Sequence, residues 1–243
     1  MSGFKKRLEY ILKHNTGIQF IYKHVMSWAF RCIGLFTKID NKLILFNSFG
    51  GRKFNDSPRV LFNAMLNDPR FVGYQFVWAF EKPDEFNIPG AKCIKIDTLE
   101  YFKTALKAKV WISSVNIERG LHFKKKNTIY INTWHGAGTK LIGNACNGRK
   151  DYNFSAVDIM LVQSGFERKI FERDFICNPE AIRVVGFPRN DELFHITEQK
   201  KIELRKQFNI PEGKKVILYA PTWRDSKDGG LSYEFVPPIN MGK

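Results

Sequence analysis

The segment that decides the fold is residues 128–136, which read Thr-Ile-Tyr-Ile-Asn-Thr-Trp-His-Gly. β-Branched and aromatic residues favour a pleated strand, so we predict a strand over Thr128–Thr133. This strand leads directly into Trp134-His135-Gly136, where the glycine lets the chain turn. In parallel sheets ligands bind at the carboxyl ends of the strands, so the residues that follow this strand are candidates for a functional site.

On both sides of this segment, short strands alternate with helical stretches. We expect further strands at Leu43–Phe46, Tyr74–Phe80, Ala91–Ile96, Val110–Ser113, Asp158–Val162 and Ile182–Val185. Helices are expected from a Ser57 cap with Pro58 at the first helical position, over Thr98–Lys107, and after residue 162 to about Phe175. This alternation predicts an α/β fold with a mostly parallel sheet.

The composition excludes intrinsic disorder and indicates an anionic partner. The 243 residues are 44% hydrophobic and 14% aromatic, which is ample for a buried core. The formal net charge of +15 favours nucleic acid, anionic lipid or a phosphorylated substrate as the partner. The four cysteines include no CxxC pair, so we expect free thiols in a reducing compartment rather than a zinc cage or a disulfide framework.

Residues 1–42 are interpreted as a basic amphipathic membrane-surface segment, with eight Lys and Arg against two acidic residues. No secretory signal is expected, and Lys23, His24 and Arg31 interrupt the apolar stretch Ile18–Phe36, which disfavours a spanning helix. The residues that recur at helical spacing are Ile18, Ile21, Tyr22, Val25, Trp28, Ala29, Cys32, Ile33 and Phe36. The alternative is a helix that packs on its own domain and has a solvated basic rim.

Residues 196–243 are expected to begin a second domain. Glu198–Phe208 predicts a charged helix and Val216–Ala220 a strand, with a turn at Pro211-Glu212-Gly213 between them. One helix and one strand cannot bury their apolar faces alone. We therefore expect one complete domain over residues 43–195 and the truncated start of another.

Several common motifs are excluded by their spacing. Gly136 and Gly138 lack the third glycine of a dinucleotide-binding fingerprint, and no Walker A or nucleophile-elbow sequence is present. Glu192-x-x-His195 occurs once, whereas a carboxylate-bridged metal site needs two copies. The sequence also has no RNA- or DNA-recognition signature. We expect no metal, no cofactor and no nucleic-acid partner.

The candidate site residues lie in three loops that directly follow predicted strands. A histidine that titrates near neutrality suits a general base, glycines let backbone N–H groups approach an anion, and Lys or Arg can hold phosphate. Together they suit phosphoryl transfer at one edge of a parallel sheet. The residues are His135 as the base, then Gly136, Gly138, Thr139 and Lys140, then Arg189 and Asn190, and finally Thr222 and Arg224 as substrate or phosphate contacts.

Four motifs in order along residues 43–225 carry a resemblance to a known family. They are Asn47-Ser48-Phe49-Gly50-Gly51 with Asn55-Asp56-Ser57-Pro58-Arg59, then Thr133-Trp134-His135-Gly136, then Val185-Gly186-Phe187-Pro188-Arg189-Asn190-Asp191, and Ile217-Leu218-Tyr219-Ala220-Pro221-Thr222-Trp223-Arg224-Asp225. This set closely resembles the CDP-glycerol glycerophosphotransferases of teichoic acid synthesis, which build a cell-wall polymer.

The resemblance implies a GT-B-like, Rossmann-type parallel-sheet domain followed by the start of a second such domain. It implies a peripheral membrane enzyme, on the cytoplasmic face of the cell membrane, that transfers glycerol phosphate from CDP-glycerol to a hydroxyl of a lipid-linked polyol phosphate acceptor. By the same resemblance, residues 43–195 form the acceptor-side domain, residues 196–243 begin the nucleotide-donor domain, and His135 activates the acceptor hydroxyl.

Two departures from the family's pattern bear on acceptor choice and activity. The family usually continues with Thr-Pro-Leu-Lys, whereas residues 137–140 here read Ala-Gly-Thr-Lys, so the loop lacks a stiffening proline. The family's carboxy-terminal half, with a second catalytic histidine, has no counterpart, so we expect a truncated member. Two other interpretations stay open: a non-catalytic membrane-associated remnant or partner subunit, and a GT-B glycosyltransferase that uses a nucleotide sugar.

Overall fold

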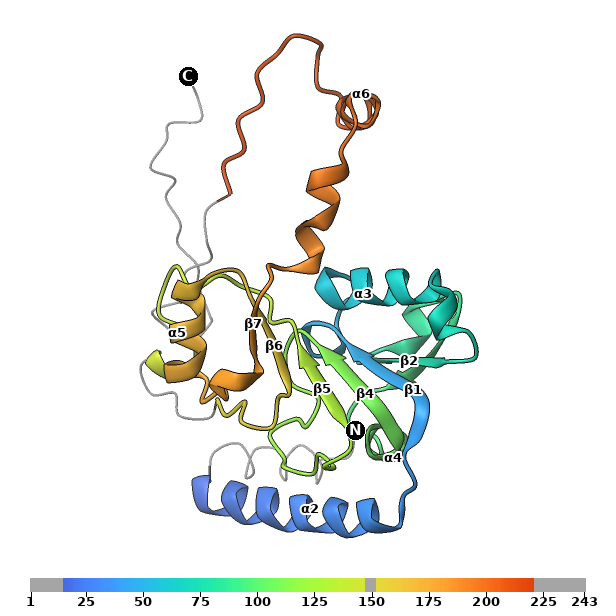
Figure 1. Cartoon of the computed structure of the whole chain (residues 1–243), viewed down its shortest axis with the longest axis vertical. Helices are drawn as coiled ribbons and strands as arrows, with labels where there is room; N and C mark the ends of the chain where they lie inside the picture. The colour runs from blue at the N-terminus through green and yellow to red at the C-terminus, as the bar shows by residue number, and fades with distance from the viewer. Residues whose placement is uncertain (1–14, 147–151, 221–243) are drawn as a thin grey trace. The chain divides into compact units, whose positions relative to one another are not determined.

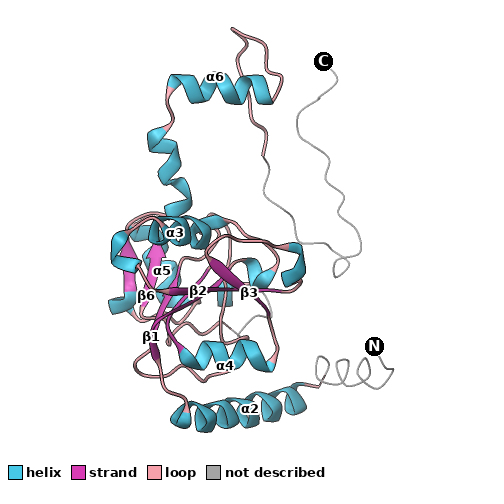
Figure 2. Cartoon of the chain, turned by 90° about the vertical axis from the view of Figure 1, so that its right-hand side faces the viewer, coloured by secondary structure: helices cyan, strands magenta, loops and turns pink. Residues whose placement is uncertain are grey.

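A computed structural model describes residues 15–146 and 152–220 of the chain. By its internal contacts the chain divides into two compact units, Met1–His195 and Ile196–Lys243. Each unit is described by itself, and Figures 1 and 2 show their elements from two directions.

The first unit is built on a seven-stranded parallel sheet (Figure 1). All seven strands predicted for this unit are confirmed, and with them the α/β fold class. The sheet order is β3-β2-β1-β4-β5-β6-β7, and each neighbouring pair is parallel. The strands are β1 (Asp40–Asn47), β2 (Gln75–Phe80), β3 (Ala91–Lys95), β4 (Ala108–Ser113), β5 (Ile129–Asn132), β6 (Ile159–Val162) and β7 (Ile182–Val184).

The chain begins the sheet with β1 and extends it in both directions. β2 and β3 are added on one side of β1, and β4 to β7 follow on the other side. This is the doubly wound order of Rossmann-type sheets, whose ligand sites lie at the carboxyl ends of the strands where the order reverses. The reversal falls between β1 and β4, so the loops after these two strands and after β5 position the candidate site.

Helices cover both faces of the sheet. Figure 2 shows α2 and α4 together on one side and α3 on the other. The helices of this unit are α2 (Thr16–Phe36), α3 (Asp56–Leu66), α4 (Leu99–Lys107) and α5 (Gly165–Asp174). Short 3-10 turns lie at η1 (Phe49–Gly51), η2 (Pro69–Phe71), η3 (Pro83–Glu85), η4 (Gly143–Ala145), η5 (Pro179–Ala181) and η6 (Pro188–His195). The predicted Ser57 cap is wrong, because α3 begins at Asp56 with Asn55 in the cap position and Ser57 inside the first turn.

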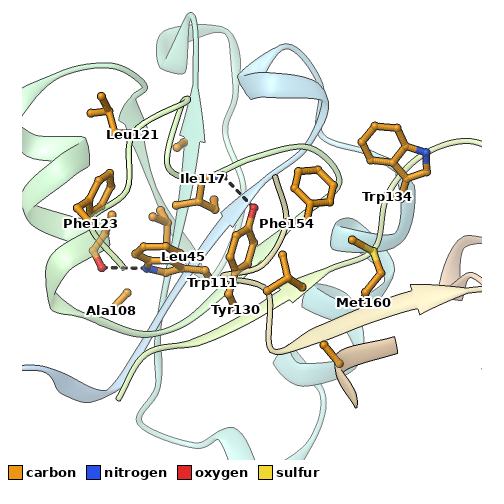
Figure 3. Close-up of a cluster of buried hydrophobic side chains, with 14 of the residues drawn as sticks. Leu45, Ala108, Trp111, Ile117, Leu121, Phe123, Tyr130, Trp134, Phe154 and Met160 are labelled. Carbon is orange, nitrogen blue, oxygen red and sulfur yellow. Dashed lines mark hydrogen bonds between the residues drawn. The ribbon is translucent and has the colours of Figure 1, made fainter. Parts of the chain in front are cut away.

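The sheet separates two hydrophobic cores, because successive side chains of a strand point to opposite faces. Leu45 of β1 belongs to one core with Leu106 of α4, and Phe46 belongs to the other with Phe62 of α3. Figure 3 shows the first core, which is rich in aromatic rings. It includes Trp111, Phe123, Tyr130, Trp134 and Phe154, with Leu45, Ala108, Ile117, Leu121 and Met160 between them.

α2 packs on the first core through one narrow face. Phe30 stacks on Phe102 with ring centroids 4.4 Å apart. Ser27 Oγ accepts the backbone N–H of His122 at 3.0 Å, and Arg31 Nε donates to the His122 carbonyl at 2.7 Å. The helix is therefore held by apolar packing and by two hydrogen bonds to the segment that follows β4.

The apolar face that the sequence predicts for α2 points away from this core. Seven of its nine residues are exposed, whereas Ala29 and Cys32 are half-buried. Trp28 is 69% exposed and Phe36 91%. α2 thus packs on its own domain through other residues, and within the described part of the chain its apolar face has no cover. Among the described residues, no helix is both long and apolar enough to cross a membrane.

The second unit contains the predicted helix but not the predicted strand. α6 (Glu198–Gln207) begins with Thr197, whose side chain accepts the Lys200 N–H. The prediction of a strand over Val216–Ala220 is wrong, because these residues pair with no strand in the described chain. Ile217 and Leu218 are each 85% exposed. β-Branched residues favour a pleat only where a neighbouring strand is present to pair with them.

Candidate active site

Three neighbouring strands, β1, β4 and β5, end at the same level of the sheet. Asn47, Ser113 and Asn132 are aligned across them in register. The ladder continues one step further, because Ser114 N–H donates to the Asn47 carbonyl at 3.3 Å and Thr133 N–H to the Ser113 carbonyl at 2.9 Å. The loops that follow these strands therefore leave the sheet together.

His135 is oriented by the main chain at the end of β4. Its Nδ1 lies 2.6 Å from the carbonyl oxygen of Ser114. A carbonyl oxygen only accepts hydrogen bonds, so Nδ1 carries the proton and Nε2 keeps its lone pair. Nε2 makes no hydrogen bond within the described residues, and the imidazole packs beside Phe49, with ring centroids 5.1 Å apart. The histidine predicted as a base therefore presents the tautomer that a base needs.

The surroundings of His135 favour its neutral form. Burial lowers the pKa of His135 below its usual value because the imidazolium loses hydration. The Ser114 carbonyl and the Asp56 carboxylate raise this pKa, whereas Arg189 and Arg52 lower it. Burial is the largest of these effects, so the ring is uncharged at neutral pH and can accept a proton.

Left-handed backbone conformations cluster around His135. Phe49, Asp56 and Trp134 have φ of 48°, 61° and 50°, values that non-glycine residues seldom adopt. Hydrogen bonds hold the backbone of two of them: Phe49 N–H donates to Ser114 Oγ at 3.1 Å, and Trp134 N–H donates to Asn132 Oδ1 at 2.8 Å. Such strain persists where the surrounding structure over-determines it, and it concentrates at functional sites.

Arg189 is placed near His135, and its guanidinium is held by a carboxylate. Nη1 lies 3.0 and 3.2 Å from the two oxygens of Asp56, whose side chain is only 4% exposed. The guanidinium also lies 4.5 Å from the centroid of the Phe187 ring. Asn190 closes the turn, since its N–H donates to the Phe187 carbonyl at 2.9 Å. Arg189 therefore contributes to the electrostatics around His135 while it is neutralised by Asp56.

Gly138 makes a close contact with α5 and does not present a free amide. Its N–H donates to Glu167 Oε1 at 3.3 Å, and a Cβ at this position would lie 2.5 Å from Ile170 Cδ1. Glu167 is buried and also accepts the Gln163 N–H at 2.7 Å. The glycine predicted to bring its N–H to a phosphate thus anchors the loop to α5. Gly136, directly after the histidine, is half-buried.

Thr139 and Lys140 line a cavity of about 480 Å³ together with α5. Its other basic residues are Lys169 and Arg173, and Arg173 pairs with Asp174 at 2.7 Å. This cavity does not include His135 among its lining residues. The structure therefore places the two candidate phosphate contacts in a basic hollow beside α5, separate from the histidine.

The remaining candidates lie elsewhere. Thr222 and Arg224 are outside the described residues. His195, from the isolated Glu192-x-x-His195 pair, is exposed on η6. Among the described residues, no group of three His, Cys, Asp or Glu side chains could hold a metal ion.

Three residues that shape the site were not among the predicted candidates. Ser114 acts through its carbonyl, which carries no sequence signal. Asp56 lies inside the first motif, and a carboxylate at the start of a helix is a sequence signal for an ion-pair partner, here Arg189. Glu167 follows Ser164 by three residues, the spacing of a capping box, and Ser164 Oγ accepts its N–H at 3.3 Å.

Residues 29–243 match the family model of CDP-Glycerol:Poly(glycerophosphate) glycerophosphotransferase. The chain is 34% identical over 202 residues to a teichoic acid poly(glycerol phosphate) polymerase of Staphylococcus epidermidis, covering 76% of this chain and 28% of that protein. It is 28% identical over 239 residues to a teichoic acid glycerol-phosphate transferase of Staphylococcus aureus, covering 90% of this chain and 59% of that protein.

A solved structure of the wall teichoic acid polymerase TagF has the same fold. It superposes with a TM-score of 0.67 at 29% identity, covering 86% of this chain and 56% of TagF. The chain thus spans between 28% and 59% of the length of these three relatives. The match over most of the chain confirms the resemblance expected from the four motifs, and the chain belongs to the CDP-glycerol:poly(glycerophosphate) glycerophosphotransferase family.

Proposed function

We propose that this protein takes part in teichoic acid synthesis by transferring glycerol phosphate from CDP-glycerol to a hydroxyl of a lipid-linked polyol phosphate acceptor. The observation that carries the proposal is the 2.6 Å contact between His135 Nδ1 and the Ser114 carbonyl, which leaves Nε2 as a free base at the sheet edge. Relatives named as polymerases and transferases of teichoic acid glycerol phosphate support it, as does a TagF structure obtained after a CDPG soak.

In the proposed reaction, Nε2 of His135 takes the proton of the acceptor hydroxyl as that oxygen attacks the β-phosphorus of CDP-glycerol. A new phosphorus–oxygen bond forms to the acceptor, and the bond from the β-phosphorus to the bridging oxygen breaks, which releases CMP. The imidazolium then loses its proton to solvent. The lowered pKa of His135 keeps it ready to accept a proton at neutral pH.

We assign binding of the negatively charged phosphates to residues in both parts of the chain. We assign acceptor binding to residues 43–195, in a GT-B-like arrangement whose donor side begins in residues 196–243. Gly136, Gly138, Thr139 and Lys140 belong to the acceptor side, with Gly138 acting by anchoring the loop through Glu167. Arg189 and Asn190 form the rim beside His135, and Thr222 and Arg224 are assigned to the pyrophosphate of the donor.

The amino-terminal segment, residues 1–42, is proposed to hold the protein on the anionic cytoplasmic face of the cell membrane. The exposed side chains Trp28 and Phe36 of α2 support this assignment, because apolar residues beside Lys and Arg bind at the lipid headgroup boundary. Lys23, Arg31 and Lys38 supply positive charge along the same segment.

The test is CMP release by the full chain from CDP-glycerol in the presence of a lipid-linked glycerol phosphate acceptor. We expect release to depend on the acceptor and to fall at least about 100-fold in His135→Asn, which keeps an Nδ-type donor but removes the base. His195→Asn, which changes an exposed histidine of η6, is the matched control and should leave the rate unchanged. CMP release by neither wild type nor variants would favour the non-catalytic interpretation and overturn the proposal.

A further inference from the structure

A second cavity lies between α2 and the segment that follows β4, and it does not include His135. Its volume is about 570 Å³, within the range of small-molecule sites. The residues that matter for its chemistry are Lys23 and Arg119, Asp97, and the aromatic rings of Tyr22, Phe102 and Phe154. Val115 and Asn116 also line it, and they are the two residues that follow Ser114, whose carbonyl orients His135.

The wall formed by residues 115–121 is fixed by buried side chains. Tyr101 OH donates to the Ile117 carbonyl at 2.5 Å, and Tyr130 OH accepts the Ile117 N–H at 3.1 Å. Asn132 Nδ2 donates to the Val115 carbonyl at 2.6 Å. The opposite wall, α2, is tied to the residue that follows this segment, because Ser27 Oγ accepts the His122 N–H. The cavity is therefore preformed, so a ligand need not order its walls on binding.

Strained backbone and opposite charges meet at this cavity. Asp97 and Arg119 have φ of 60° and 56°, and their side chains pair through two hydrogen bonds of 2.8 and 2.9 Å. Gly120 has φ of 82° and a Cβ there would lie 3.7 Å from Lys23 Cε, so the lysine stem rests on the glycine. Lys23 forms no ion pair within the described residues. The lining thus keeps one unneutralised cation, held against a rigid turn.

The cavity is apolar as well as basic, and it is continuous with the exposed face of α2. Phe102 and Phe154 give it ring surfaces. Tyr22 lines the cavity and is also 45% exposed, with Ile18 and Val25 as its neighbours on the helix surface. A ligand that combines an anionic group with an apolar chain would satisfy both parts of this surface.

We propose that this cavity binds the phosphodiester headgroup of an anionic amphiphile, with the phosphate at Lys23 and Arg119 and the apolar chain directed along Tyr22 and the exposed face of α2. The inference rests on the proposed membrane docking of α2 and adds a defined headgroup site to it. Soluble phosphate offers the same charge without an apolar chain, so the two sources are separated by experiment.

The test uses the full chain and monomeric short-chain lipids, below their micelle concentration, in a calorimetric titration. We expect dihexanoyl phosphatidylglycerol to bind and dihexanoyl phosphatidylcholine to bind much more weakly. Lys23→Gln should weaken phosphatidylglycerol binding by about five-fold or more, as loss of one cation beside a phosphate predicts. Lys206→Gln removes an equal charge from an exposed residue of α6 that does not line the cavity, and should leave the affinity unchanged. Equal weakening by both variants would mean general electrostatics and would overturn the site.

A second variant tests the cavity itself. Gln19 lines it from α2, and Gln19→Trp should fill the space and abolish phosphatidylglycerol binding while circular dichroism stays unchanged. The same titrations are made with inorganic phosphate and glycerol 3-phosphate, which carry the charge without an apolar chain. If these anions bind as tightly as the lipid, and Lys23→Gln weakens their binding to the same extent, the cavity is a site for a soluble anion and the amphiphile proposal is overturned.

Membrane docking is measured separately, by co-sedimentation of the same proteins with phosphatidylglycerol vesicles. Vesicle binding without monomer binding would overturn the headgroup site and leave the docking proposal standing. Monomer binding that is sensitive to Lys23→Gln, without vesicle binding, would leave the site standing and overturn docking.

Discussion

Arg189 and Asp56 are 133 residues apart in the sequence, and the Arg189 guanidinium donates to both carboxylate oxygens of Asp56. The pair joins the turn after β7 to the first residue of α3. Arg189 N–H also reaches Ser57 Oγ at 3.4 Å. Two of the family motifs are therefore in contact beside His135, although neither includes the histidine.

Removing the charge of Asp56 should destabilise the first unit. In Asp56→Asn the left-handed backbone is retained at little cost, because asparagine tolerates positive φ, and the change isolates the ion pair. We expect the free energy of unfolding to fall by about 1–3 kcal/mol, less than for a fully buried pair because the Arg189 side chain is 28% exposed. Urea denaturation checks this. Asp191→Asn, an exposed neighbour on η6, should change stability by less than about 0.5 kcal/mol, and equal effects of the two substitutions would argue against a role for the pair.

The titration of His135 should respond oppositely to the two partners of that ion pair. We expect its pKa, followed by NMR of the ring protons, to lie below the ordinary value of about 6.5. Arg189→Gln removes a cation that lowers the pKa and should raise it, whereas Asp56→Asn removes an anion and should lower it further. Shifts in the same direction in both variants would contradict this electrostatic arrangement.

The same titration sets the sign of a pH effect on stability. Because the folded-state pKa of His135 is lower than the unfolded value, the unfolded chain binds the proton more readily. Its contribution to stability is present above about pH 6.5 and is lost as the pH falls toward the folded-state pKa. The urea midpoint of wild type, relative to that of His135→Gln, should therefore fall as the pH is lowered from 7.5 to 5. A wild-type midpoint that rises relative to the variant over this range would overturn this.

Gly138 should tolerate a methyl group only when the opposing side chain is shortened. Gly138→Ala places a Cβ 2.5 Å from Ile170 Cδ1, so we expect a loss of about 1–3 kcal/mol in the free energy of unfolding. Ile170→Val removes that atom, and the next nearest atom, Ile170 Cγ1, is 3.8 Å away. In the Ile170→Val background the alanine should cost less than about 0.5 kcal/mol more.

Gly165→Ala is the control for this pair, because a Cβ there meets nothing within 4 Å and should be neutral or slightly stabilising. Additive costs in the double variant, measured by urea denaturation, would show that the contact with Ile170 is not what requires glycine at position 138.

An acidic residue in the exposed face of α2 should weaken membrane binding without unfolding the protein. Trp28→Glu removes an apolar side chain that is 69% exposed and adds a negative charge. Because the aromatic side chain would no longer be buried in the lipid boundary, we expect binding to anionic vesicles to be at least about ten-fold weaker. Val72→Glu, which alters a residue outside α2 that is 77% exposed, should co-sediment with the vesicles like wild type. Unchanged binding by Trp28→Glu would remove α2 as the anchor.

The strands of the first unit were predictable because their signals are local. β-Branched and aromatic runs mark β1 to β7. The parallel order places the loop after β5, which contains His135, at the edge where such sheets bind ligands, so the position of this histidine was predictable, whereas its role as a base stays a prediction. The contact between Arg189 and Asp56 was not predictable, since it depends on where β7 and α3 meet in space. The role of Gly138 as a phosphate contact stays a prediction. The structure adds a packing reason for this glycine, its close approach to Ile170, which the local sequence does not indicate.

Two other expectations depended on partners outside the local sequence. Residues 216–220 have the composition of a strand, but pairing decides whether a strand forms. For α2 the periodicity located the apolar stripe correctly, yet it did not indicate that Phe30, outside that stripe, makes the packing contact.

The hydrogen bond from His135 to the Ser114 carbonyl makes the orientation of the imidazole tolerant of substitutions during evolution. In many enzymes a side-chain carboxylate orients the base, so one substitution can abolish its alignment. Here the acceptor is a peptide oxygen at the end of a central strand, and every residue type at position 114 supplies that atom. The alignment of the imidazole is thus encoded by the path of the backbone, and it can outlast changes in the side chains around it for as long as the sheet itself is conserved.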